Sequence, residues 1–240
     1  MTRSCGFHTD LSCSDGYALS DKRLMTKDRA GDPVETSWGG QWWNLLSCPI
    51  KECDHHYDEP VAHIDTVIIA VDGACRDNGK SYAKAGYGVF FHRDNHPWNE
   101  CNKLANAVKT SQQAELAAGL IGLRRAKRLT LLNTDRCDKP RRPGPMRKLR
   151  RVIIKADSAY LVNAMTKWVF KWRNNNYTNC RGRPVKNAAL FRKLDAELQE
   201  LAELGVHVQF LHVRREQNRE ADLLANAALD GKTALEALTE

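Results

Sequence analysis

The stretch VIIAVDGACRDNG, residues Val67–Gly79, decides how the rest of the chain is interpreted. Five apolar residues, Val67–Val71, predict a short buried strand, and Asp72 follows where another hydrophobic residue would be expected. A buried carboxylate is costly unless a cation, a metal or several hydrogen bonds offset its charge. Asp72 therefore either faces a positive partner or ends the strand by hydrogen bonding to the turn Gly73–Gly79.

The composition indicates one core of good size plus an extension, because 42% of the 240 residues are hydrophobic. The apolar runs are shorter than the roughly 18–20 residues that span a bilayer, and the first residues, MTRSCGFHTD, lack the apolar core of a signal peptide. We expect a soluble intracellular protein, in the nucleus or the cytoplasm, with no membrane partner. The eight scattered cysteines are typical of free thiols in a reducing compartment.

The net charge of +8 is unevenly distributed along the chain. Residues 1–65 contain six Lys/Arg and eleven Asp/Glu, whereas the remaining residues contain 31 basic and 18 acidic side chains. The basic excess of the C-terminal part favours a polyanionic partner, although basic surfaces also occur without one.

Residues 1–65 are rich in Gly, Ser, Asp and Pro, which predicts an irregular or partly disordered extension. Metal-capable residues lie near its end: Cys48, Cys53, His55 and His56. They lack paired CxxC spacing, so an ordinary linker is favoured over a structural zinc site.

An α/β domain is predicted over residues 66–230, with residues 231–240 as a tail. After the first strand, Ala85–His92 alternates like a second strand and Lys103–Lys109 is the candidate third. The short connections favour an antiparallel meander.

A helix is predicted over Gln112–Arg128, since Thr110 and Gln113 have capping-box spacing and leucines form an apolar stripe. Glu115 lies in its first turn. The proline-containing basic segment Arg136–Arg151 then predicts an exposed loop. A solvated loop is favoured there over a phosphate contact or a nuclear-import patch.

The segment RVIIKADS repeats the opening pattern, because the buried strand Val152–Ile154 runs into Asp157. The helical segment that follows contains Trp168 and Trp172, whose spacing of four places both indoles on one helical face. Core packing would explain such a pair. The flanking lysines and the polar stretch Asn174–Gly182 favour an exposed protrusion that faces nucleic acid.

The C-terminal part predicts a helix over Ala188–Leu204, a strand over Val206–Val213 and a last helix from Asn218. Asp222 sits beside the apolar stripe of that helix, where the helix dipole alone could also account for a carboxylate.

Four acids thus occupy strand ends or early helical turns and could converge on one sheet edge: Asp72, Glu115, Asp157 and Asp222. Like charges repel there unless divalent cations lie among them, and ligation by oxygen alone favours Mg²⁺ or Mn²⁺. Two such ions beside a basic surface suit phosphodiester chemistry.

At these acids the chain resembles the type 1 ribonuclease H family over about Thr66–Leu229. The matching pieces are VDGACRDNG, TSQQAEL, ADSAYLVNAMTKWVFKW and NREADLLAN. The resemblance implies an α/β ribonuclease H-like fold, with a five-stranded mixed sheet flanked by helices. It also implies Mg²⁺-dependent endonucleolytic cleavage of the RNA strand of an RNA–DNA hybrid, giving 3′-hydroxyl and 5′-phosphate ends. We expect the protein to be a monomer.

The resemblance also implies roles for individual residues. Asp72 would bridge both ions, with Asp222 on the water-activating ion and Glu115 and Asp157 on the leaving-group ion. Contacts to the RNA strand would come from Asn78, Ser111 and Gln112. Contacts to the DNA strand would come from Thr110, Asn187, Trp168 and Trp172. Contacts of both kinds suit a hybrid, since only one strand carries 2′-hydroxyls.

Two departures limit the resemblance. Where members with a flexible loop usually place a histidine, HVRREQNREAD is short and contains Arg214, Arg215 and Glu216. We therefore expect a loop-short member with slower turnover or a different release route, and no catalytic role for His212. Residues 1–65 also do not resemble the small hybrid-binding domain of many cellular members.

Two other functions remain open from the sequence. A hybrid-binding module without catalysis would keep the fold, although the presence of all four acids argues against it. DNA strand cleavage or transfer, as in related integrase-like enzymes, is weakened by the residues that match the family's hybrid-binding positions.

Overall fold

The structure is a computed structural model that describes residues 7–8, 23–25, 34–38, 41–47, 62–63, 65–93, 96–134 and 149–239. Most of the basic loop Arg136–Arg151 lies outside these ranges, as do Cys48, Cys53, His55 and His56.

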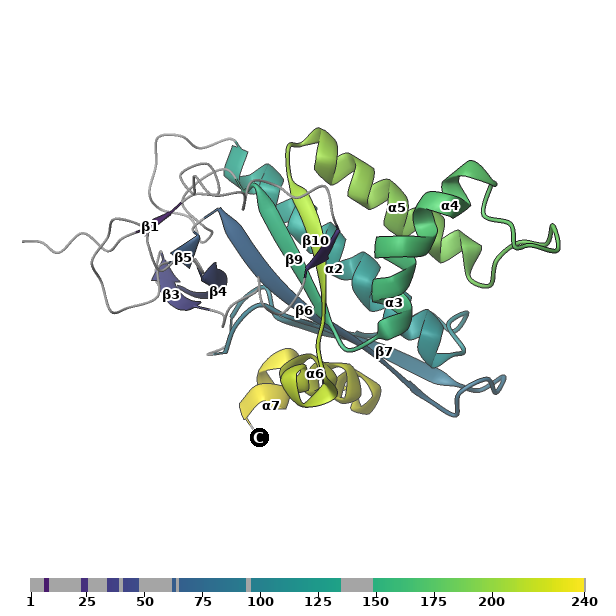
Figure 1. The fold of residues 1–240 in the computed structure, drawn as a ribbon. Helices are drawn as coiled ribbons and strands as arrows, with labels where there is room; N and C mark the ends of the chain where they lie inside the picture. Colours follow the sequence, from purple (N-terminus) through teal and green to yellow (C-terminus); the bar gives the residue numbers. More distant parts are fainter. Residues whose placement is uncertain are drawn as a thin grey trace, which may run out of the picture.

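The main sheet has the strand order β2-β10-β9-β6-β7-β8 (Figure 1). Its strands are β2 Leu24–Met25, β6 Thr66–Arg76, β7 Lys84–Phe90, β8 Glu100–Lys103, β9 Arg151–Ala156 and β10 His207–His212. Strands β6, β7 and β8 form the expected antiparallel meander, while β9 and β10 run parallel to β6. The five-stranded mixed sheet is thus confirmed, and β2 adds a short sixth strand parallel to β10 that the sequence did not predict.

The third strand of the meander lies earlier than predicted. Instead of Lys103–Lys109, the strand is β8, Glu100–Lys103, and Cys101 pairs with Gly88 of β7. The residues after Lys103 form a loop with an exposed turn, in which the Val108 amide donates to the Ala105 carbonyl at 2.9 Å.

The helices of the described residues are, in chain order, α2 Ser111–Thr134, α3 Ala159–Asn163, a π-helical turn Ala164–Trp168, α4 Val169–Asn174, α5 Ala188–Glu203, a 3₁₀ turn Arg215–Gln217, α6 Arg219–Asp230 and α7 Ala234–Thr239. The last of them falls in the segment predicted as a tail. In Figure 1, α2, α3 and α5 lie on one side of the sheet and α6 and α7 on the other. None of these helices is long and apolar enough to cross a membrane.

Successive side chains of β6 point to opposite faces of the main sheet and pack into the helices on either side. Ile69 and Val71 belong to the larger core on the α2 and α5 side, whereas Ala70 packs with Phe90 and the apolar residues of α6. A strand that buries both faces reads as an unbroken apolar run, which is the pattern seen in the sequence.

The N-terminal part contains a hairpin of β3, Val34–Trp38, and β4, Gln41–Ser47. Strand β4 also pairs with β5, Ala62–His63, which in turn pairs with β1, Phe7–His8. Trp43 and Leu45 are 1% and 2% exposed and belong to the main core, and the Trp43 ring lies 4.5 Å from that of His96. Within the expected irregular or partly disordered extension, residues 34–38 and 41–47 are therefore strands, and two side chains two positions apart on β4 face the core.

Candidate active site

The parallel pairing of β6 and β9 brings Asp72 and Asp157 to the same sheet edge. Ala70 is in register with Lys155, so Asp72 and Asp157 stand at equivalent positions two residues further along. The parallel pairing ends at Ala70 and Lys155, so both carboxylates lie just beyond its carboxyl end. The expectation that Asp72 ends its strand is wrong, because β6 continues to Arg76 through its pairing with β7.

Glu115 reaches this edge because α2 approaches β6 unusually closely. A Cβ atom on Gly73 would lie 2.2 Å from the carbonyl carbon of Ala114 and 2.3 Å from the amide nitrogen of Glu115. Only a residue without a side chain fits between the two backbones. The glycine that follows Asp72 thus determines how near Glu115 comes.

Three of the four predicted acids form one cluster. Asp72, Glu115 and Asp157 each offer a carboxylate oxygen, and these oxygens all lie within 4.8 Å of one another. Asp72 is buried and the other two are half-buried. Carboxylates at this spacing can hold a divalent cation, since hard cations prefer oxygen ligands.

The pKa values of these acids reflect their crowding. Burial and the charges of Asp157 and Asp222 raise the pKa of Asp72 to about 7. Burial and the neighbouring carboxylates of Asp72 and Asp157 raise the pKa of Glu115 to about 9. The metal-free site thus opposes full ionisation, and a bound cation would relieve that opposition.

The fourth acid, Asp222, lies outside this three-acid cluster. Its Oδ1 accepts a 2.5 Å hydrogen bond from Nη2 of Arg215, a mostly exposed side chain. Helix α6 approaches the sheet at Gly88, where a Cβ atom would lie 2.3 Å from the Ala221 carbonyl oxygen. Asp222 nevertheless contributes to the charge around Asp72 and Glu115.

Asn218 is a site residue that sequence reasoning missed. It is fully buried directly before α6, and its Nδ2 donates to the Val71 carbonyl and to Oδ1 of Asp157, both at 3.0 Å. One amide therefore ties the start of α6 to β6 and orients an acid of the cluster. The only signal in the sequence was its position as a helix N-cap.

A cleft of about 520 Å³ opens beside Asp157 and is lined also by His212, Val213, Arg214, Arg215 and Glu216. His212 is exposed, and its Nε2 lies 3.1 Å from the Asp157 carbonyl oxygen. The short segment that differs from the family pattern thus forms a wall of the site.

The residues predicted to contact RNA gather at the start of α2. The Ser111 amide donates to Oδ1 of Asn78 at 3.0 Å, which joins the turn after β6 to the helix. Oγ1 of Thr110 accepts from the Gln113 amide at 3.3 Å, as the capping box predicts. The reciprocal bond is shifted by one residue, because Gln113 Oε1 accepts from Lys109 instead of Thr110.

The two tryptophans lie together on a segment that we call the basic protrusion, residues 166–187, which contains six Lys/Arg and no acid. Helix α4 and the loop after it stand out from the body in Figure 1. The Trp168 and Trp172 ring centroids are 5.7 Å apart. Trp168 is 39% exposed, whereas Trp172 packs against the buried Phe191 at 4.7 Å.

Asn187 closes the basic protrusion next to these rings. Its Nδ2 donates to the Tyr160 hydroxyl at 3.3 Å, and the Tyr160 ring lies 6.0 Å from that of Trp168. Core packing therefore accounts for the position of Trp172 against Phe191. Trp168, by contrast, keeps an exposed face that remains available to a ligand.

Comparison with known proteins places these features in one context. The RNase H family model matches residues 65–230, which is more than half of the chain. Ribonuclease H1 of Mus musculus is 29% identical over 165 residues, covering 67% of this chain and 49% of that protein. Ribonuclease H of Clostridium botulinum is 33% identical over 165 residues, covering 68% of this chain and 95% of that protein. The chain therefore spans about half the length of the mouse relative.

Among solved structures, LC11-RNase H1 isolated from compost has a TM-score of 0.47 and 21% identity, covering 68% of this chain and 95% of that one. The crystal structure of LC11-RNase H1 in complex with RNA/DNA hybrid has a TM-score of 0.45 and 23% identity, covering 68% and 96%.

Proposed function

The chain belongs to the RNase H family, and on that premise we propose that it is an endoribonuclease that cleaves the RNA strand of RNA–DNA hybrids, leaving 3′-hydroxyl and 5′-phosphate ends. The observation that supports this most is the convergence of Asp72, Glu115 and Asp157, whose oxygens lie within 4.8 Å of one another. Residues 66–230 form the proposed catalytic domain.

The proposed cofactor is a pair of Mg²⁺ ions, for which Mn²⁺ can substitute. Asp72 would contribute to holding both ions, Asp222 would join it at the water-activating ion, and Glu115 with Asp157 would hold the leaving-group ion. When bound, such ions activate a water and stabilise the departing oxygen in phosphodiester hydrolysis. Support comes from the all-oxygen donor set and from the crowding that raises the pKa values of Asp72 and Glu115.

Recognition of the RNA strand is proposed for Asn78, Ser111 and Gln112. The hydrogen bond between Asn78 and Ser111 holds the turn after β6 against the start of α2, on the same two elements that carry Asp72 and Glu115. A site built on these elements can read 2′-hydroxyls beside the acids, which distinguishes RNA from DNA.

Recognition of the DNA strand is proposed for Thr110, Asn187, Trp168 and Trp172. The exposed Trp168 face offers a stacking surface, and the six basic residues of the protrusion offer charge for phosphates. All four acids belong to one chain, so we propose that the protein acts as a monomer. The nucleus and the cytoplasm are its proposed compartments.

A cleavage assay with the purified full chain tests this function. RNA–DNA, RNA–RNA and DNA–DNA duplexes of one sequence are each incubated with titrated Mg²⁺. We expect cleavage of the hybrid alone, in its RNA strand. Nicking of DNA would point to the integrase-like alternative, and hybrid binding without cleavage in Mg²⁺ or Mn²⁺ would point to a binding module.

The matched variants are Asp72→Asn and Asp77→Asn. Both remove one carboxylate, but Asp77 is an exposed turn residue with φ 55°, a conformation that asparagine tolerates. We expect Asp72→Asn to abolish cleavage while hybrid binding survives, and Asp77→Asn to cleave normally. Full activity of Asp72→Asn would overturn the proposal.

A further inference from the structure

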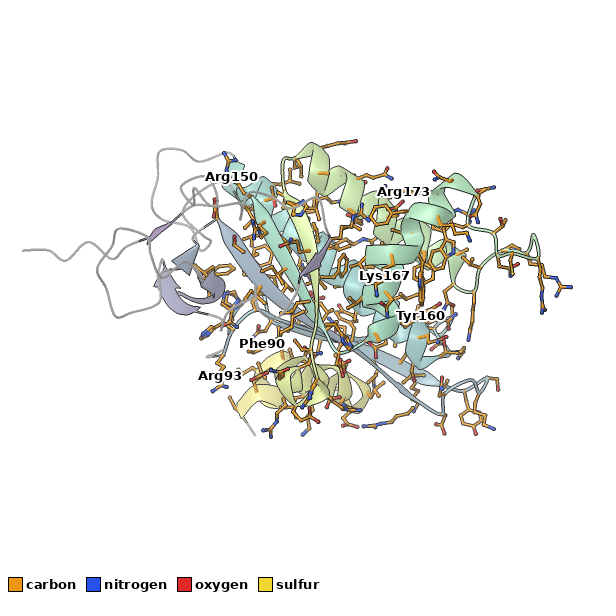
Figure 2. The ribbon with its side chains drawn as sticks, in the orientation of Figure 1. Phe90, Arg93, Arg150, Tyr160, Lys167 and Arg173 are labelled. Carbon is orange, nitrogen blue, oxygen red and sulfur yellow. The ribbon has the colours of Figure 1, made fainter. Side chains whose placement is uncertain are left out.

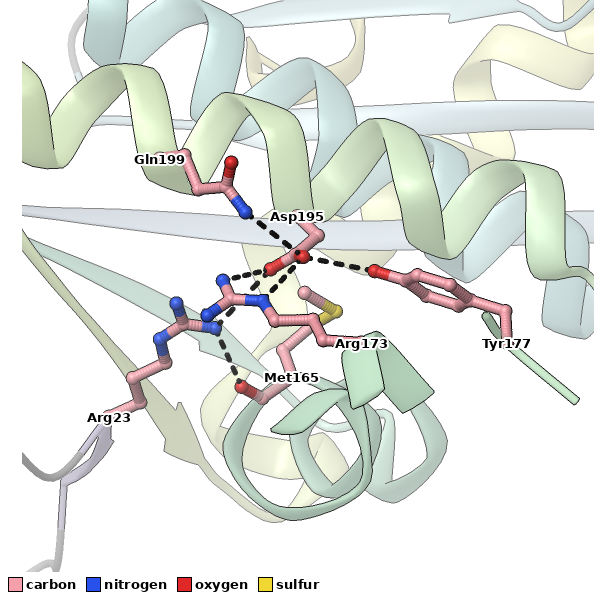
Figure 3. Close-up of polar contacts among 6 residues, drawn as sticks. All are labelled: Arg23, Met165, Arg173, Tyr177, Asp195 and Gln199. Atoms are coloured by element: carbon pink, nitrogen blue, oxygen red, sulfur yellow. Dashed lines mark hydrogen bonds and ion pairs between the residues drawn. The ribbon is translucent and has the colours of Figure 1, made fainter. Parts of the chain in front are cut away.

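Asp195 on α5 is a buried carboxylate, 4% exposed, that anchors the basic protrusion. Arg173 of α4 donates to it from Nε at 2.6 Å and from Nη2 as well, and the Tyr177 hydroxyl donates at 2.9 Å (Figure 3). Gln199 adds a longer bond of 3.4 Å from its own helix. Because the protrusion contains six cations and no acid, this carboxylate supplies the negative charge that holds its base against α5.

Arg23 reaches the same carboxylate from the N-terminal part of the chain. Its Nη1 lies 3.8 Å from Oδ1 of Asp195 and donates to the Met165 carbonyl at 3.4 Å. Its guanidinium carbon also lies 5.0 Å from the ring centroid of the exposed Phe170. One side chain thus contacts α5, α4 and the π-helical turn between α3 and α4.

The backbone of Arg23 is fixed to the sheet. Its carbonyl accepts from the Phe210 amide at 2.7 Å, and the next residues, Leu24 and Met25, form β2 beside β10. Without β2, strand β10 would present an unpaired edge. Arg23 therefore links the edge of the sheet to the base of the protrusion.

Charge alone does not explain this link. Arg23 and Arg173 share the carboxylate of Asp195, so these three side chains together keep a net positive charge. Burial and the Arg173 charge lower the pKa of Arg23. What Arg23 adds is geometric: a carbonyl contact at Met165, a cation–π contact at Phe170 and a backbone bond to β10.

We propose that Arg23 is a positioning residue that fixes the orientation of the basic protrusion and thereby sets the affinity for an RNA–DNA hybrid. The second clause rests on the proposed function, in which the protrusion carries Trp168 to the DNA strand. The chemistry at the acids does not depend on the Arg23 side chain, because its contacts lie on α4, α5 and the turn between α3 and α4.

Hydrogen exchange of the full chain without nucleic acid tests the structural part. In Arg23→Gln we expect the amides of residues 165–178 to exchange several-fold faster than in the original protein, with the sheet amides unchanged. The charge-matched control is Arg93→Gln, since Arg93 is 69% exposed and lies far from Arg173 in Figure 2. Unchanged exchange of residues 165–178 in Arg23→Gln would overturn the proposal.

Steady-state cleavage of a hybrid tests the second part. We expect Arg23→Gln to raise KM about three- to tenfold, toward the low end of the loss of one stacked base, because Trp168 would be displaced but not removed, with kcat within about twofold. Adding Trp168→Ala to Arg23→Gln should then raise KM less than Trp168→Ala does alone. An equal loss in kcat, or an unchanged KM, would overturn this part. If the original protein neither binds nor cleaves hybrids, the proposed function fails, while the exchange experiment still decides the role of Arg23.

Discussion

Arg215 donates a hydrogen bond of 2.5 Å from Nη2 to Oδ1 of Asp222, so the acid outside the three-acid cluster is held by an arginine of the adjoining 3₁₀ turn. The same guanidinium lowers the pKa of Asp72 and of Glu115, although burial and the other acids outweigh it. Arg215 thus partly neutralises the site that we propose for metal ions.

Replacing Arg215 with glutamine should tighten Mg²⁺ binding. Removal of one positive charge from an exposed position near the acids is worth on the order of 0.5–1 kcal/mol, or about two- to fivefold in Kd. Titration calorimetry of Mg²⁺ into the metal-free protein measures this. Arg214→Gln, a neighbour in the same cleft, is the control and should change Kd less. Weaker binding in Arg215→Gln would show that Arg215 assists the ions instead of competing with them.

The raised pKa values of Asp72 and Glu115 predict that the metal-free protein loses stability as pH rises. Their folded values of about 7 and about 9 lie above those of the unfolded chain, which are about 4. The folded protein therefore binds protons that the unfolded chain has released, and stability falls from about pH 4 upward through these two values. We expect a loss on the order of 6 kcal/mol between pH 5 and pH 8, since each group costs about 1.4 kcal/mol per pH unit over which only the folded chain keeps its proton.

Urea unfolding in EDTA at several pH values measures that loss. Asp72→Asn removes one of the two groups and should flatten the dependence, and saturating Mg²⁺ should reverse it. Stability that rises over this range in EDTA would contradict the crowding of the acids.

Gly73→Ala should destabilise the protein strongly, because the new Cβ would lie 2.2 Å from the backbone of Ala114. Forcing strand and helix apart costs about 2–3 kcal/mol or more, and it would also move Glu115 away from Asp72. The control is Gly182→Ala, where nothing lies within 4 Å and only the φ of 70° opposes a side chain, at about 1 kcal/mol. Equal losses of unfolding free energy in the two variants would contradict the close approach.

The elements that could be predicted from the sequence are those in which pattern and burial agree. The apolar runs before Asp72 and Asp157 are buried strands, and their shared direction brings the two acids together. Trp43 was missed because its hairpin lies in a segment of loop-like composition, where two inward side chains give little periodicity.

Contacts between distant segments could not be predicted in this way. The bond from Asn218 to the Val71 carbonyl joins positions 147 residues apart, and the bond from Arg23 to Met165 joins positions 142 apart. Neither bond is encoded in a local sequence pattern, because each depends on how two secondary-structure elements pack against each other. Polar residues with such tertiary roles look like ordinary caps or surface residues in the sequence.

Substitutions of the two tryptophans of the basic protrusion should affect hybrid affinity and folding stability to different extents. Trp168 is 39% exposed, so Trp168→Ala should cost less than about 1 kcal/mol of unfolding free energy but weaken hybrid binding about tenfold through a lost stacking surface. Trp172 packs on Phe191, so Trp172→Ala should cost about 2–3 kcal/mol of unfolding free energy. Chemical unfolding and hybrid titration at fixed salt measure both quantities. The control is Leu235→Ala on α7, an exposed apolar residue outside the protrusion, which should change neither the unfolding free energy nor the hybrid affinity. Hybrid binding that is unaffected by Trp168→Ala would show that the protrusion is not part of the proposed interface.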